Sequence, residues 1–245
     1  DRKIKRICMM RAGVIGLGDM GSGLAKNLLK AGFETTGIDM KPERMAAFVE
    51  MGGRAAVDVA DVGANADAVF VMVMNGDQVK SVLFGAGGLL AHMPKGGAVI
   101  LSATIKPVEA EEIGAAMADS GIHLIDTPVS GGFPGAQGGT LTMMAAGVDE
   151  VLDTYAPVME AVSATIWCVG TEAGQGQTVK ACLQSLLGAM FSATFEASVL
   201  AAKAGINGEV FHNVVANSSG GCGITAGSLE KIIDRQFEGT GSHIA

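Results

Sequence analysis

The chain has 245 residues, of which 49% are hydrophobic and 17% charged, so it can bury a sizeable core and is not expected to be disordered. Its 17 basic and 25 acidic residues leave a net charge of −8, which argues against a general affinity for nucleic acid or an anionic membrane surface. The 36 glycines show no three-residue period, which excludes a collagen-like chain. No run of about 18 uninterrupted apolar residues occurs, so no transmembrane helix is expected.

The cysteines and histidines show no metal-binding pattern. Cysteines stand at positions 8, 168, 182 and 222 and form neither a Cys-x-x-Cys pair nor a zinc spacing, and the four histidines are likewise unpaired in spacing. Four reduced, mostly buried thiols are expected. The basic amino-terminal run is followed by an apolar run that breaks at Arg11, so no secretory signal is expected and a cytoplasmic protein is predicted.

From Ala12 to about Val169, short apolar runs alternate with segments of helical spacing. The runs expected as strands are Ala12–Gly16, Glu34–Asp39, Ala68–Met74, Gly97–Leu101, Ile122–Thr127, Thr140–Gly147 and Thr165–Val169. The segments expected as helices are Met20–Lys30, Pro42–Met51, Pro107–Ser120 and Asp149–Ala161. This alternation predicts an α/β fold with a Rossmann-type, doubly wound and mainly parallel sheet.

The period changes after Gly170. From Gly174 to about Ala204 only helical spacing is found, and about 30 residues of helix span about 45 Å. Such a helix is expected to leave the first domain and to begin a second, all-helical one. Two more helices are expected, at Glu209–Ala216 and Thr225–Arg235. The predicted domains are therefore residues 1–170 and residues 171–245.

A glycine-rich turn joins the first expected strand to the first expected helix. Gly16 allows the tight turn, Gly18 lets the backbone approach a pyrophosphate, and Gly21 lets the helix pack close to the strand. The free N–H groups at the helix start suit phosphate. Asp39 follows about 20 residues later, at the end of the second strand, where a carboxylate reaches ribose hydroxyls. The pattern predicts dinucleotide binding; flavin binding or a purely structural turn is the alternative.

Asp39 also bears on the choice between the two nicotinamide cofactors. A carboxylate at this place repels a ribose 2′-phosphate, which favours NAD over NADP. Lys41 and Arg44 lie close enough in sequence to weaken that repulsion.

Four segments in order along the chain resemble the β-hydroxyacid dehydrogenases, the group that includes 3-hydroxyisobutyrate dehydrogenase. They are Gly16-Leu17-Gly18-Asp19-Met20-Gly21, Leu101-Ser102-Ala103-Thr104-Ile105, Asp126-Thr127-Pro128-Val129-Ser130-Gly131-Gly132, and the stretch from Gly170 through Gly174 and Gly176 to Lys180. The resemblance implies a Rossmann domain followed by a helical domain like that of 6-phosphogluconate dehydrogenase, with a cleft between them.

The same resemblance implies the site residues. Lys180 is implied as the catalytic acid/base, and Ser130, Gly131 and Gly132 as the groups that hold a small carboxylate substrate. The residues implied to hold NAD are Gly16, Leu17, Gly18, Asp19, Met20, Gly21, Asp39, Met74, Asn75, Val79 and Thr104.

The residues themselves partly support these roles. Lys180 is the only charged residue from Ala173 to Phe195, as expected of a buried lysine whose pKa falls towards neutrality through desolvation. The alternative is an exposed lysine on a helix surface. The Ser-Gly-Gly run at 130–132 can turn several N–H groups inward as an anion nest, and an ordinary glycine turn is the alternative.

One position departs from the family pattern. Members carry Asn one helical turn after the catalytic lysine, whereas this chain has Gln184, which keeps an amide on the same helix face. This resembles the L-threonate dehydrogenase branch and favours a four-carbon sugar acid such as L-threonate as substrate. 3-Hydroxyisobutyrate or tartronate semialdehyde is the alternative within the class, and a catalytically silent NAD-binding scaffold is the alternative outside it.

Family members continue with further helices and a Lys-Asp-Leu segment, whereas this sequence stops at Ala245. The helical domain is therefore expected to be short. Its long first helix would expose apolar side chains unless a partner subunit covers them, and a homo-oligomer, a dimer or tetramer, is predicted.

Overall fold

The computed structural model describes residues 10–236. The basic amino-terminal run, Cys8 and His243 lie outside the described residues. The chain forms two compact units, of which the first ends at Lys180 and the second begins at Ala181.

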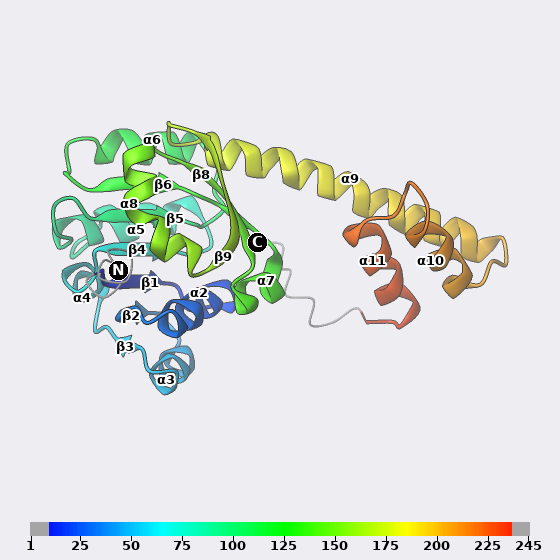
Figure 1. Ribbon diagram of the computed structural model, residues 1–245, viewed down its shortest axis with the longest axis horizontal. Coiled ribbons are helices and arrows are strands. Elements are labelled where there is room, and N and C mark those ends of the chain that lie inside the picture. Colours follow the sequence, from blue (N-terminus) through cyan, green and yellow to red (C-terminus); the bar gives the residue numbers. More distant parts are fainter. Residues whose placement is uncertain (1–9, 237–245) are drawn as a thin grey trace. The chain divides into compact units, whose positions relative to one another are not determined.

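The first unit is built on one nine-stranded sheet with the order β3-β2-β1-β4-β5-β6-β8-β7, and β9 pairs with β8 (Figure 1). The strands are β1 (Ala12–Ile15), β2 (Thr35–Ile38), β3 (Arg54–Ala55), β4 (Ala68–Val71), β5 (Ala98–Leu101), β6 (His123–Asp126), β7 (Val129–Ser130), β8 (Leu141–Ala146) and β9 (Ser163–Gly170). Strands β1 to β6 are parallel, and β8 is antiparallel to β6 and β7. The predicted doubly wound, mainly parallel sheet is therefore confirmed.

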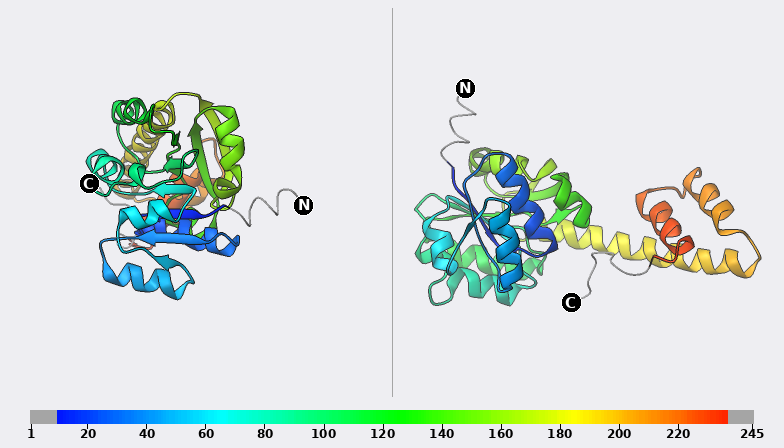
Figure 2. Two further views of the ribbon diagram at one scale, coloured as in Figure 1. Left: turned by 90° about the vertical axis from the view of Figure 1, so that its left-hand side faces the viewer. Right: turned by 90° about the horizontal axis from the view of Figure 1, so that it is seen from below.

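Helices cover both faces of this sheet, as Figures 1 and 2 show. They are α2 (Asp19–Lys30), α3 (Pro42–Glu50), α4 (Val59–Ala64), α5 (Gly76–Phe84), α6 (Pro107–Met117), α7 (Gly132–Gly138) and α8 (Asp149–Glu160). Adjacent strand residues point to opposite faces: Phe70 belongs to the core beneath α2, α3 and α8, and Val69 to the core beneath α4, α5 and α6. Both faces are buried, which explains the continuously apolar strands.

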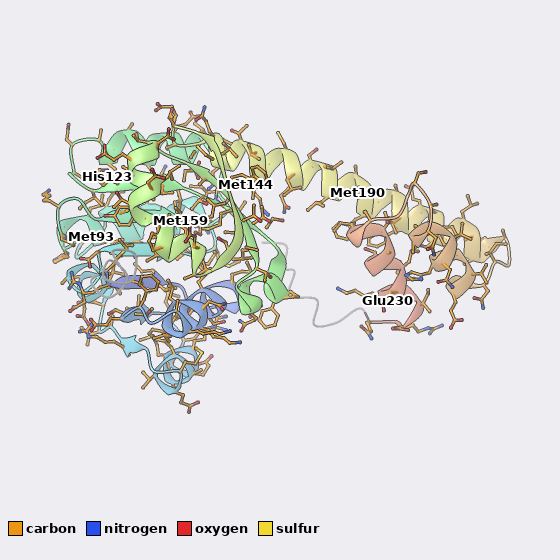
Figure 3. All side chains as sticks on the ribbon, in the orientation of Figure 1. Met93, His123, Met144, Met159, Met190 and Glu230 are labelled. Atoms are coloured by element: carbon orange, nitrogen blue, oxygen red, sulfur yellow. The ribbon has the colours of Figure 1, made fainter. Side chains whose placement is uncertain are left out.

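Methionines fill gaps in both cores. Met93, Met144 and Met159, labelled in Figure 3, are all nearly inaccessible to solvent. Their flexible thioether side chains suit irregular space between helices and sheet.

The sequence missed three helices of the first unit. Asp58 and Asn75 cap α4 and α5 by accepting hydrogen bonds from the backbone N–H groups of Asp61 and Gln78. The expected strand Ala68–Met74 was too long, because the strand ends at Val71 and the chain turns towards the Asn75 cap. The glycine-rich α7 has low helix propensity and is held by tertiary packing.

The second unit consists of the carboxyl-terminal part of α9 (Gln175–Lys203) with α10 (Gly208–Ala216) and α11 (Gly223–Ile233). The turn after α9 contains Gly205, whose φ of +77° suits glycine, and the Asn207 side chain caps α10. The helices α10 and α11 lie beside each other within this unit (Figure 1).

The long helix α9 carries an exposed apolar surface in the second unit. Leu186, Phe191, Phe195, Val199 and Leu200 are all more than one third exposed, and Leu200 reaches 71%. In the described part of the chain, α9 alone is long and apolar enough to cross a membrane. Its most apolar stretch of 18 residues has a mean hydropathy of 1.4, and 6% of that stretch is buried. The sequence expectation rested on uninterrupted apolar runs and overlooked a helix rich in small residues.

Candidate active site

The glycine-rich turn lies between β1 and α2 and accepts no side chain at two positions. Gly16 has a φ of +90°, and a Cβ there would lie 2.3 Å from the carbonyl oxygen of Met72. A Cβ on Gly21 would lie 1.7 Å from the carbonyl oxygen of Gly16. Gly18 is the N-cap of α2 and supplies no capping side chain. The turn therefore brings bare backbone and the positive end of α2 to one place, which suits a pyrophosphate.

Asp39 joins this turn to the end of β2. Its carboxylate accepts hydrogen bonds from the backbone N–H groups of Leu17 (2.8 Å) and Lys41 (2.9 Å). Arg44 pairs with the same carboxylate at 3.2 Å, and the Asp39 side chain is 8% exposed. Asp39 thus fixes the turn, and Arg44 neutralises part of its charge.

A cavity of about 250 Å³ lies beside the turn and α3. It is lined by Leu17, Gly18, Asp19 and Ser22 from the turn and α2, and by Glu43, Arg44, Ala47, Phe48 and Met51 from α3 and the residue that follows it. The glycine cradle, the uncapped helix start and this cavity together fit the adenosine and phosphate end of a dinucleotide.

The carboxyl ends of β4 and β5 carry the residues implied on the nicotinamide side. Met74 is 60% exposed, and Asn75 caps α5. Thr104 is exposed between the buried Ala103 and Ile105. Val79, by contrast, has no exposed surface and packs in the core beneath α4, α5 and α6. Val79 therefore offers no surface with which to contact a cofactor.

The Ser-Gly-Gly segment leads directly into α7. Ser130 ends β7, Gly131 and Gly132 are exposed with φ of +133° and +58°, and α7 begins at Gly132. Only glycine adopts such angles readily at successive positions. The segment therefore presents accessible backbone beside the Ser130 hydroxyl.

Lys180 is buried in the second turn of α9. It is 8% exposed, and burial lowers the pKa of its amine from the ordinary value of 10.5. Among the described residues it forms no ion pair. The expectation of a desolvated lysine agrees with this environment, and the exposed alternative does not. Gln184 follows one turn later, is exposed and belongs to the second unit.

Sequence reasoning assigned no role to two buried polar residues at the start of α9, the helix that carries Lys180. Asp126 ends β6 and Gln177 lies in the first turn of α9; the two side chains are hydrogen-bonded at 2.9 Å. An acid at a strand end, paired with a Gly-x-Gly helix start farther along the chain, is the only sequence signal that points to them.

Within the described residues no cluster of His, Cys, Asp and Glu suited to a metal ion is found. Cys168, Cys182 and Cys222 are free thiols, as expected, but all three are exposed, which corrects the expectation that the thiols are mostly buried.

Two family profiles cover most of the chain. The NAD binding domain of 6-phosphogluconate dehydrogenase matches residues 11–170, and the NAD-binding region of NADP-dependent 3-hydroxyisobutyrate dehydrogenase matches residues 174–243.

Curated relatives and solved structures agree with these profiles. L-threonate dehydrogenase of Escherichia coli is 39% identical over 226 residues, which cover 92% of this chain and 75% of the relative. NAD-dependent L-serine dehydrogenase of Pseudomonas aeruginosa is 37% identical over 87% of this chain and 71% of the relative. The crystal structure of 3-hydroxyisobutyrate dehydrogenase from Salmonella typhimurium superposes with a TM-score of 0.84 at 34% identity, over 93% of this chain and 80% of the other.

The glycine turn, the doubly wound sheet and these similarities define an NAD-binding dehydrogenase that acts on the hydroxyl group of hydroxy acids. The chain belongs to the β-hydroxyacid dehydrogenase family.

Proposed function

We propose that this protein oxidises a four-carbon sugar acid, with L-threonate as the leading substrate, and that Lys180 is its general acid/base. The observation that carries the proposal is the burial of Lys180. Burial lowers the pKa of its amine and so favours the uncharged form, which can act as a base. Gln184 and the similarity to L-threonate dehydrogenase support the choice of substrate.

In the direction of oxidation, the neutral amine of Lys180 accepts the proton of the substrate hydroxyl group. In the direction of reduction, the ammonium group of Lys180 returns that proton. NAD, when bound, supplies the hydride acceptor. The hydroxyl of Ser130 and the N–H groups of Gly131 and Gly132 hold the substrate carboxylate.

The residues proposed to hold the cofactor lie along the carboxyl edge of the sheet. We assign the phosphates to the turn Gly16–Gly21, including Leu17, Asp19 and Met20, and the adenosine ribose to Asp39. Met74, Asn75 and Thr104 line the nicotinamide side. In domain terms, residues 1–170 bind NAD and residues 171–245 form the helical domain.

A second substrate class is favoured by a specific observation: the similar Salmonella structure is a 3-hydroxyisobutyrate dehydrogenase. Tartronate semialdehyde belongs to the same alternative. A catalytically silent scaffold is disfavoured, because a scaffold has no need to keep a lysine in a desolvated position.

The test is a panel of L-threonate, erythronate, 3-hydroxyisobutyrate, L-serine, glycerate and tartronate semialdehyde, with NAD(H) consumption or production followed by absorbance. We expect the highest kcat/KM with L-threonate. A higher value with 3-hydroxyisobutyrate would move the protein to the alternative, and no turnover with any acid, despite measurable NAD binding, would support the scaffold.

We also infer a homo-oligomer in the cytoplasm, in which a second copy of the chain covers the apolar side chains of α9. Phe195 and Leu200 are among several large apolar side chains that α9 leaves exposed, and exposed apolar surface of this kind commonly marks a protein interface. Sizing at micromolar concentration without detergent should give a dimer or tetramer. A monodisperse monomer, or a protein that needs detergent to stay in solution, would contradict this inference.

A further inference from the structure

The first turn of α9 is fastened to the sheet by a buried carboxylate. Asp126 has no exposed surface. Its Oδ2 accepts hydrogen bonds from the backbone N–H groups of Gly174 (2.9 Å) and Gln177 (3.2 Å), and its Oδ1 accepts one from Gln177 Nε2 (2.9 Å). Burial raises the pKa of Asp126, while these hydrogen bonds oppose the rise. The carboxylate thus satisfies N–H groups that the start of a helix otherwise leaves unpaired.

The side-chain amide of Gln177 extends this contact to the loop after β5. Gln177 is 1% exposed. Its Oε1 accepts a hydrogen bond from the backbone N–H of Ile105 (3.0 Å), and its Nε2 donates to the carbonyl oxygen of Ala103 (3.0 Å) as well as to Asp126. The two loop contacts lie on either side of Thr104. The amide of Gln177 therefore holds the backbone on both sides of Thr104, while the side chain of Thr104 stays exposed.

The absence of a side chain at Gly176 allows the start of α9 to pack closely against the sheet. A Cβ on Gly176 would lie 2.6 Å from the carbonyl oxygens of Asp126 and Met144, so the start of α9 rests directly on the ends of β6 and β8. Lys180 follows Gln177 by three residues, which places it about one turn farther along the same helix. Any rotation or shift of the first turn therefore moves the amine of Lys180.

We propose that Asp126 and Gln177 are positioning residues for catalysis, which hold the first turn of α9 and the loop around Thr104 in one fixed geometry. The inference rests on the proposed function in taking Lys180 as the acid/base and Thr104 as part of the nicotinamide side. Neither side chain touches the substrate in this proposal; each acts through Lys180 and Thr104.

The size of the effect follows from geometry. A displacement of about 1 Å at a reacting group costs up to roughly 100-fold in rate. A buried Asp126 that has lost one donor also draws water or rearranges, because an unsatisfied buried acceptor is unfavourable. We therefore expect kcat to respond strongly and NAD affinity, which we assign mainly to the Gly16–Gly21 turn and Asp39, to change much less.

The decisive variants are Gln177→Met, which keeps the length and removes all side-chain hydrogen bonds, and Asp126→Asn. Each should lower kcat roughly 10- to 100-fold and raise the dissociation constant of NAD by a much smaller factor. Tyr155→Phe is the matched control, because Tyr155 lies on α8, away from the site, and the change removes its partly buried hydrogen bond to the carbonyl oxygen of Gly96. It should lower stability without changing kcat.

A double variant tests the pairing itself. In Asp126→Asn/Gln177→Glu the amide introduced at position 126 can donate to the carboxylate introduced at position 177, so the hydrogen bond is kept with its direction reversed. The contact to the Ala103 carbonyl becomes unfavourable, because a carboxylate oxygen replaces the amide donor, and recovery should be partial. A double variant that is more active than both Asp126→Asn and Gln177→Glu supports the clamp formed by Asp126 and Gln177, whereas additive losses show that the two side chains act independently.

A readout independent of activity separates this inference from the proposed function. Hydrogen–deuterium exchange should accelerate in both segments 103–105 and 174–180 of Gln177→Met, and in neither segment of Tyr155→Phe. Unchanged exchange there, or an unchanged kcat in a folded Gln177→Met protein, overturns the clamp. If the unmodified protein turned over no substrate of the panel, the proposed function would be wrong. The exchange experiment would still test whether Asp126 and Gln177 form the clamp.

Discussion

The two ends of the candidate site are built in different ways. The adenosine end consists of backbone that glycine leaves bare, with Asp39 and Arg44 at its edge. The catalytic end consists of buried side chains, Asp126, Gln177 and Lys180, that come from β6 and α9. The first end is local in sequence and tolerates little change in shape. The second end depends on segments about fifty residues apart, and it tolerates little change in polarity.

The largest expected effect separates these ends directly. Lys180→Ala removes the proton acceptor, and kcat should fall about 10²- to 10⁴-fold, which is the usual contribution of general acid–base catalysis. Because the adenosine end is untouched, NAD binding measured by calorimetry should not change. Undiminished turnover would remove Lys180 from the mechanism, and a parallel loss of NAD affinity would show that the two ends are coupled.

The converse change is Gly21→Ala. The added Cβ would lie 1.7 Å from the carbonyl oxygen of Gly16, so the turn must open. Overpacking of this kind costs about 1–3 kcal/mol, and the affinity for NAD should fall roughly 10- to 100-fold. Gly227→Ala is the matched control, since Gly227 lies within α11 with nothing within 4 Å of its added Cβ. Equal NAD affinity of the two variants would contradict the role given to the turn.

The same difference explains what could be predicted from the sequence. The glycine spacing and Asp39 are close enough in sequence to be recognised with the strand and helix around them, and the doubly wound sheet follows from the alternation of apolar runs and helical spacing. The isolation of Lys180 among uncharged residues correctly indicated a buried lysine. These features all depend on neighbours in the chain.

The features that could not be predicted depend on distant contacts. Nothing near Gln177 in sequence shows that its amide binds the backbone of Ala103 and Ile105. The helix α7 forms from residues of low propensity because close packing against α2 holds it; a Cβ on Gly23 of α2 would lie 2.5 Å from the backbone of Ala136. Val79 matched the family pattern, but its burial follows from the tertiary packing of α5.

A smaller effect is expected at the edge of the adenosine end. Asp39→Ser removes the carboxylate that we assign to the ribose and frees the guanidinium of Arg44, so the ratio of kcat/KM for NADP to that for NAD should rise roughly 10-fold or more. Steady-state kinetics with both cofactors measures it. The gain should disappear in Asp39→Ser/Arg44→Met. If the double variant keeps the gain, Arg44 does not contact the 2′-phosphate.

The smallest effect concerns the stability of the catalytic end. Burial lowers the pKa of Lys180 below its ordinary value of 10.5, so the unfolded chain binds the proton more tightly than the folded one. The resulting destabilisation is fully present below the lowered pKa and disappears as the pH rises to 10.5. Lys180→Met should therefore raise Tm at neutral pH, and the gain should shrink as the pH approaches 10.5. Scanning calorimetry between pH 7 and pH 10.5 measures the gain, and Lys203→Met, at an exposed position of the same helix, should show none. A gain that does not vary with pH would mean that Met stabilises α9 by packing alone, and that the charge of Lys180 carries no cost in the folded protein.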